Sequence, residues 1–152
     1  MVKWLNSNNL TLNEDKCEYM IFRRRRKKFA TCNRKLYLNG KELRRVTSAK
    51  FLGVYLDEFL DWRIHVSNLT VKISKFVPIL YRVRDQLTSN SLKIVYNALI
   101  SPNFYYCCSV WGSCNQSVRN SLNVLQRKLI RIICFEDRCS HALPLFIKEH
   151  RL

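Results

Sequence analysis

Apolar residues recur at helical spacing through the second part of the chain. One seam runs from Trp62 to Leu87 in alternating steps of four and three residues, which predicts an amphipathic helix. Pro78 lies inside this seam and is expected to kink the helix or divide it near Val77, because proline lacks the backbone N–H and its ring clashes with the preceding turn. Asp61 or a neighbour is expected to cap the start of the helix.

The same spacing predicts further helices after this seam. One covers about 89–100, with Leu92, Val95, Tyr96 and Leu99 on one face. Ser101-Pro102 resembles a cap followed by a first-position proline, and predicts a short aromatic helix through Trp111 that Gly112 stops. A long helix is expected over about 117–135, where Val118, Leu122, Leu125, Leu129 and Ile132 form the seam, and a last helical piece over 142–150. These segments together predict a helical bundle.

The first part of the chain alternates short apolar runs with turns. Residues 2–9 suggest the end of a helix, whereas 10–12, 17–22 and 50–57 are expected to be strands. Asn39-Gly40, with apolar alternation on each side, is a strong hairpin signal because a type I′ turn needs positive φ at both central residues. The predicted fold class is α+β: a small antiparallel sheet within residues 1–58, followed by an all-helical bundle over 59–152.

Composition narrows the class of protein. The 152 residues are 47% apolar, which suffices for a packed core, and no apolar run approaches the roughly 20 residues of a membrane span. The first residues do not resemble a signal peptide, so the seven cysteines are interpreted as reduced thiols of an intracellular protein, nuclear or cytoplasmic. Cys134, Cys139 and His141, with Cys114 far away, do not match the spacing of a zinc site, and no metal is expected.

Charge is the outlier of the composition. Lys and Arg number 27 against 11 Asp and Glu, a net charge of +16, which indicates a polyanionic partner: nucleic acid first, an anionic membrane surface second. Six cations follow one another at Arg23, Arg24, Arg25, Arg26, Lys27 and Lys28. This run suits a phosphate contact or a nuclear localisation signal, with a solvated loop as the alternative. The bundle adds cations beside its seams: Lys72, Lys75, Arg82, Arg84, Arg119, Arg127, Lys128 and Arg131.

Residues that carry catalysis are scarce. The three histidines lie far apart in the sequence, no Asp-Asp pair occurs, and the three glycines are isolated. A metal-dependent phosphoryl transferase needs converging carboxylates, and a phosphate-binding loop needs clustered glycines. The residues alone therefore predict neither an enzyme nor a cofactor.

Three blocks resemble LINE-type, non-LTR retrotransposon reverse transcriptases, and the jockey-like subgroup in particular. Trp4, Asn9-Leu10, Leu12-Asn13, Lys16 and Tyr19-Met20-Ile21-Phe22 are similar to the segment that follows the catalytic Asp-Asp motif, with Cys17 in place of the usual Thr. Lys50 to Asp57, then Trp62 and His65, resemble the next block, which contains the Phe-Leu-Gly turn of the primer grip. Tyr96 to Pro102, Val110-Trp111-Gly112 and Leu125 to Arg131 resemble the thumb helices.

The resemblance implies a palm edge with the primer grip over 1–58 and a thumb over 59–152. Lys16 would lie near nucleotide phosphates, or else be an exposed turn lysine. Phe51, Leu52 and Gly53 would hold the primer end in a β-hairpin, or else form an ordinary buried strand. The partner would be a primer–template duplex of RNA or DNA, contacted also by the six-cation run and by the thumb cations Lys72, Lys75, Arg127, Lys128 and Arg131.

The resemblance also implies what the chain does alone. The fingers and the palm strands with the metal-binding aspartates are expected to be absent, so Mg²⁺ is expected only in a full-length polymerase, and no small-molecule substrate or membrane partner is expected. The main hypothesis is a fragment that binds nucleic acid without polymerase activity. The alternatives are a piece of a working polymerase within a longer product, a protein-interaction or regulatory remnant that uses the aromatic segment 104–111, and a product with no selected role.

Overall fold

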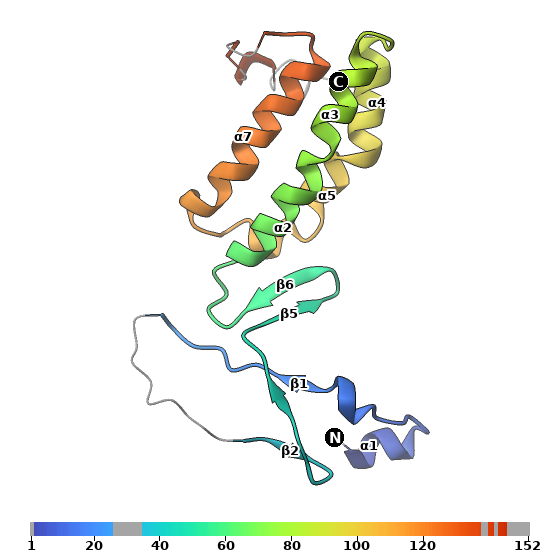
Figure 1. The fold of residues 1–152 in the computed structure, drawn as a ribbon, viewed down its shortest axis with the longest axis vertical. Coiled ribbons are helices and arrows are strands. Elements are labelled where there is room, and N and C mark those ends of the chain that lie inside the picture. Colours follow the sequence, from blue (N-terminus) through green and yellow to red (C-terminus); the bar gives the residue numbers. More distant parts are fainter. Residues whose placement is uncertain (1, 26–34, 138–139, 142, 146–152) are drawn as a thin grey trace. The chain divides into compact units, whose positions relative to one another are not determined.

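The computed structural model describes residues 2–25, 35–137, 140–141 and 143–145 (Figure 1). The chain divides into two compact units, Met1–Leu60 and Asp61–Leu152. The first holds short strands and the second holds helices, so the predicted α+β class is confirmed. Most of the predicted last helix, 142–150, lies outside the described residues.

The first unit is built from short elements with little apolar core. It contains α1 (Val2–Ser7), the 3-10 helix η1 (Glu14–Lys16), β1 (Glu18–Tyr19), β2 (Tyr37–Leu38), β3 (Lys41–Glu42), β4 (Arg44–Arg45), β5 (Ser48–Phe51) and β6 (Val54–Asp57). The strands form three separate two-stranded ladders: β2–β3 and β5–β6 are antiparallel, and β1–β4 is parallel. Among its described residues only Val54, Asp57 and Glu58 are buried, which explains why no larger sheet forms.

The predicted Asn-Gly hairpin is confirmed. Asn39 and Gly40 have φ of 49° and 85°, and they connect β2 to β3, with Leu38 paired to Lys41. The predicted single strand over 50–57 is wrong. A second two-residue turn, Leu52-Gly53, folds this segment into the β5–β6 hairpin.

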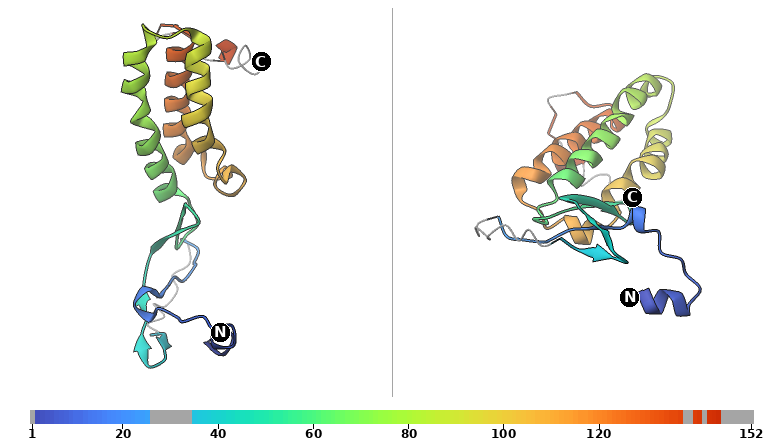
Figure 2. Two further views of the ribbon diagram at one scale, coloured as in Figure 1. Left: turned by 90° about the vertical axis from the view of Figure 1, so that its right-hand side faces the viewer. Right: turned by 60° about the horizontal axis from the view of Figure 1, so that its bottom comes forward.

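The second unit is a bundle of helices α2 (Arg63–Ser74), α3 (Phe76–Arg84), α4 (Ser89–Leu99), α5 (Ser101–Tyr105), α6 (Cys108–Trp111) and α7 (Gln116–Ile133) (Figure 1). The α2–α3 arm and α7 run parallel: Thr70 Oγ1 lies 3.3 Å from Ser121 Oγ, and the Arg84 guanidinium lies 5.0 Å from the Phe135 ring centroid. In both pairs the partner is 51 positions farther along the chain, so the two arms keep one register over this length. Helix α4 then runs in the opposite direction, antiparallel to α3 (Figure 2).

The core of the bundle follows the predicted seams. Its fully buried side chains include Ile73, Leu80, Leu92, Ile100, Leu129, Ile132 and Ile133. The predicted division of the first seam is confirmed and falls at Lys75, between α2 and α3. Pro78 lies in the first turn of α3, and the carbonyl that its ring would crowd in a continuous helix belongs to Ser74, the last residue of α2.

Capping residues set the helix starts. Asp61 Oδ1 accepts a hydrogen bond from the Arg63 N–H at 3.2 Å, as expected of a residue near this start. The Thr88 hydroxyl accepts from the Ser91 N–H, and the Asn115 amide oxygen accepts from the Ser117 N–H. Each of these short polar side chains satisfies a backbone donor that has no partner within its helix.

Two details of the predicted helices are wrong. Leu99 is exposed, and Ile100 enters the core in its place because α4 ends at this point. The aromatic helix is not continuous: Cys107 has φ of 51° and separates α5 from α6. The Tyr106 carbonyl at this break accepts a hydrogen bond from the Trp111 indole at 2.8 Å, which compensates for the interrupted helix.

Candidate nucleic-acid interface

The β5–β6 hairpin ends in two exposed apolar side chains. Phe51 and Leu52 are 63% and 75% exposed, and Gly53 beside them is also exposed. Leu52 has φ of 43°, a left-handed conformation that is unusual for a branched apolar residue. The alternative of an ordinary buried strand is therefore wrong for Phe51 and Leu52. The structure instead places both at the tip of a hairpin, where a partner can reach them.

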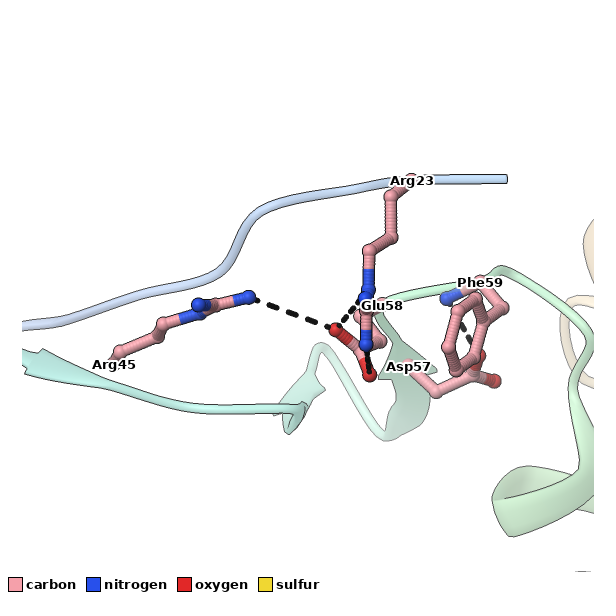
Figure 3. A network of polar contacts seen from close by, with 5 residues as sticks. All are labelled: Arg23, Arg45, Asp57, Glu58 and Phe59. Carbon is pink, nitrogen blue, oxygen red and sulfur yellow. Dashed lines mark hydrogen bonds and ion pairs between the residues drawn. The ribbon is translucent and has the colours of Figure 1, made fainter. Parts of the chain in front are cut away.

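The base of this hairpin binds the start of the basic run (Figure 3). The Arg23 guanidinium donates two hydrogen bonds to the Glu58 carboxylate, Nε to Oε2 at 2.8 Å and Nη2 to Oε1 at 2.9 Å. Arg45 Nη2 lies 3.8 Å from the same carboxylate. Hydrogen bonding from Arg23 holds the pKa of Glu58 below its usual value. Arg23 is thus part of the fold, and it fixes the basic run to the base of the hairpin.

The cations that follow Arg23 have different surroundings. The Arg25 guanidinium lies 4.7 Å from the centroid of the Phe59 ring, and Arg23 lies 5.0 Å from the same centroid. Arg24 is exposed. Arg26, Lys27 and Lys28 lie outside the described residues.

Lys16 occupies a separate part of the first unit. It is exposed at the end of η1, whose acidic residues are engaged by others: Lys41 pairs with Asp15, and the Asn39 amide donates to Glu14 at 2.7 Å. This position agrees with the exposed turn lysine that the sequence left open as the alternative.

The predicted bundle cations lie on two parallel arms. Lys72, Lys75, Arg127 and Lys128 are exposed, whereas Arg131 is half-buried and its Nε donates to the Ser140 carbonyl at 2.8 Å. Because α7 keeps register with the α2–α3 arm, Lys75 lies at the same height along the bundle as the stretch around Arg127. The exposed cations of both arms are thus brought to one section of the bundle.

The bundle has a charge imbalance that the residue-by-residue sequence reasoning missed. The stretch 63–133 contains ten Lys and Arg residues and a single acidic one, Asp85. The first unit is also basic, with 14 Lys and Arg residues against six Asp and Glu over residues 1–60, but several of its carboxylates pair with cations, as in Glu18 with Arg44 and Glu42 with Lys35. Counting charges over each predicted helix of the sequence would have shown that the helices are almost free of acidic residues. The bundle therefore carries an uncompensated positive field that attracts polyanions.

Two other kinds of site, a metal centre and a membrane span, can be checked among the described residues. Among them, no three His, Cys, Asp or Glu side chains gather into a group that would hold a metal ion. No helix in the described ranges combines the length and the apolar character needed to cross a membrane.

Three curated proteins are similar to most of this chain. The RNA-directed DNA polymerase from mobile element jockey of Drosophila funebris is 29% identical over 136 residues, and its namesake from Drosophila melanogaster is 27% identical over 135. The probable RNA-directed DNA polymerase from transposon X-element of Drosophila melanogaster is 25% identical over 134 residues. The predicted resemblance to jockey-like reverse transcriptases is confirmed.

The similarity covers most of this chain but only a small part of each similar protein. The matches take in 86–87% of this chain but only 14% of each of these polymerases, so the chain is similar to one short segment of them. No family model matches the chain, and no solved structure matches it.

Proposed function

We propose that this chain is the part of a retrotransposon reverse transcriptase that holds the primer–template duplex. The observation that carries the proposal is the exposed tip of the β5–β6 hairpin, with Phe51 and Leu52 turned to solvent at the position that resembles the primer grip. Fold stability does not account for this tip, since it exposes two large apolar side chains and holds one of them in the left-handed region. A partner that packs on the tip accounts for both features.

The helical bundle supplies the electrostatic part of the contact. Ten cations against one carboxylate over 63–133 suit the phosphates of a duplex that lies along a thumb-like bundle. Because phosphate contacts carry no base information, binding is expected to be largely independent of sequence and to respond to duplex shape. Lys72, Lys75, Arg127 and Lys128 are the exposed cations proposed for this role.

The chain alone is not expected to polymerise. Metal-assisted phosphoryl transfer needs carboxylates that converge on the ions. The sequence has no Asp-Asp pair, and the acidic residues around the hairpin base are engaged: Asp57 accepts from the Phe59 N–H, and Glu58 binds Arg23. These residues do not fit a catalytic magnesium site, and Mg²⁺ chemistry belongs to the full-length polymerase.

Fluorescence anisotropy with a recessed primer on an RNA template tests the proposal. We expect the double variant Phe51→Ser, Leu52→Ser to weaken binding several-fold, whereas Leu36→Ser should bind like wild type. Leu36 is also exposed in the same unit, but its carbonyl binds the Leu43 N–H beside the β2–β3 hairpin, which forms a ladder separate from β5–β6. Wild-type affinity in the double variant would contradict the proposed role of the tip.

A second candidate function is protein contact. Exposed apolar side chains on α4 to α6, including Ile94, Leu99, Tyr105 and Val110, favour it, since a partner protein or another part of the polymerase would cover them. Such a contact would resist salt, whereas binding through phosphates weakens with salt. Measuring complex formation at two salt concentrations therefore separates the two functions.

A further inference from the structure

The bundle contains a cavity that the hairpin and the exposed cations do not use. Its volume is about 230 Å³, and α4, α5, α6 and α7 line it. Four of its lining residues are aromatic: Tyr96, Phe104, Tyr105 and Trp111. Arg119, Asn123 and Gln126 add a guanidinium and two amides. The cavity therefore combines aromatic faces with planar hydrogen-bonding groups.

The size of the cavity limits its occupant. Sites for drug-sized ligands and cofactors usually measure roughly 300–1,000 Å³, so this cavity suits a smaller group, such as one planar ring system. The aromatic walls favour a flat occupant that can stack on them.

One wall is fixed and another is open to solvent. Trp111 is buried, and its indole N–H is held by the Tyr106 carbonyl at 2.8 Å. Tyr105 is 66% exposed, so it lies where an incoming ring meets the solvent. A ring that enters the cavity would therefore find a preformed surface and an accessible aromatic side chain at its rim.

The polar groups come from one face of α7. Arg119, Asn123 and Gln126 follow at intervals of four and three residues, which places them along a single stripe of the helix. The Arg119 guanidinium is already oriented, because Nη1 donates to the Gly112 carbonyl at 3.0 Å and Nη2 donates to Gln116 Oε1 at 2.8 Å. Its Nε is buried and has no hydrogen-bond partner among the described residues. A buried donor of this kind is unfavourable unless an acceptor arrives.

We propose that this cavity binds one unpaired nucleobase of a single-stranded stretch of nucleic acid. A base offers a flat face for the aromatic side chains, together with ring nitrogens and carbonyl oxygens for Arg119, Asn123 and Gln126. Gln126 already hydrogen-bonds Tyr96, but an apolar protein side chain would offer no acceptor to Arg119 Nε and no partner to the Asn123 amide. The inference rests on the proposed nucleic-acid binding, and it adds a contact to the base itself, whereas the hairpin and cation contacts address the primer end and the phosphates.

Binding of a single-stranded RNA of about ten nucleotides, compared with an abasic chain of equal length and charge, tests the inference. Stacking on aromatic side chains is strong enough that wild type should prefer the RNA by about tenfold. Tyr105→Ala and Asn123→Ala should reduce this preference several-fold. The matched controls Tyr106→Ala and Asn97→Ala change exposed residues outside the cavity and should keep it.

A blunt RNA–DNA duplex distinguishes the two proposals. Equal affinity of wild type for RNA and abasic chain, with the duplex still bound, would overturn the base pocket and leave the proposed function standing. Equal losses in Tyr105→Ala and Tyr106→Ala would also overturn it, because the contact would then lie outside the cavity. Failure to bind any of the three nucleic acids would overturn both proposals.

Discussion

The backbone at Leu52 stores strain in the middle of the proposed interface, and Leu52→Asn should release it. Holding a residue with a Cβ in the left-handed region, as at Leu52, costs roughly 1–2 kcal/mol. Asparagine tolerates this region better, which is why Asn-Gly is favoured in type I′ turns. Leu52 is three-quarters exposed, so the substitution loses only about 0.5 kcal/mol of the roughly 1.5–3 kcal/mol that full burial of a leucine provides. Because asparagine keeps part of the cost of the left-handed region, the hairpin should gain about 0.5–1 kcal/mol after this loss.

Hydrogen–deuterium exchange of the β5 and β6 amides, followed by NMR, measures this gain directly. A gain of 0.5–1 kcal/mol corresponds to exchange that is slower by roughly two- to fivefold if these amides open locally. Leu52→Val is the matched control: it stays apolar, but its β-branch suits the left-handed region even less, so exchange should become faster. Nucleic-acid affinity should fall in Leu52→Asn although its hairpin is more stable.

Two results would refute this reasoning. Unchanged or faster exchange in Leu52→Asn would mean that the turn is not strained. Slower exchange with undiminished affinity would mean that the tip is strained for a reason other than contact with nucleic acid.

Three further predictions concern stability. Leu129→Ala empties a fully buried core position and should cost about 2–5 kcal/mol in urea unfolding, whereas Val124→Ala on the exposed face of the same helix should stay within about 0.5 kcal/mol. Hydrogen bonding from Arg23 lowers the pKa of Glu58, so the ion pair stabilises the fold above pH 4.5, and this stabilisation is lost as the pH falls through the lowered pKa. An NMR titration should show the pKa of Glu58 return toward 4.5 in Arg23→Ala. Burial lowers the pKa of His65 below 6.5, so the urea midpoint should fall as the pH drops from 6.5 toward 5, and a His65→Phe variant should lose this part of the pH dependence.

Locally encoded features were predictable from the sequence. The apolar seams fixed the positions of α2, α3, α4 and α7, because helical periodicity depends on neighbours a few residues apart. The Asn39-Gly40 turn was predictable because these residue types favour positive φ. The Leu52-Gly53 turn was missed for the opposite reason: leucine normally avoids this region, and its apolar character extended the pattern of a strand.

Features that depend on distant residues were not predictable. Arg23 was grouped with the cations for phosphate contact, yet its partner Glu58 lies 35 residues away and nothing local marks the pair. The break at Cys107 depends on how Trp111 packs and binds the Tyr106 carbonyl. The residues that line the cavity likewise come from four helices, so their proximity could not be predicted from the sequence.

The central claim, that the chain binds nucleic acid through its cations, is tested most directly by titrating an RNA–DNA hybrid at several salt concentrations. Neutralising roughly six phosphates predicts that log K falls with log salt at a slope of about −5. The triple variant Lys75→Gln, Arg127→Gln, Lys128→Gln, which leaves Arg23 and the hairpin intact, should make the slope shallower by about 3, roughly one for each lost contact, and should weaken all sequences alike. A slope near zero in wild type, or an unchanged slope in the triple variant, would contradict the account.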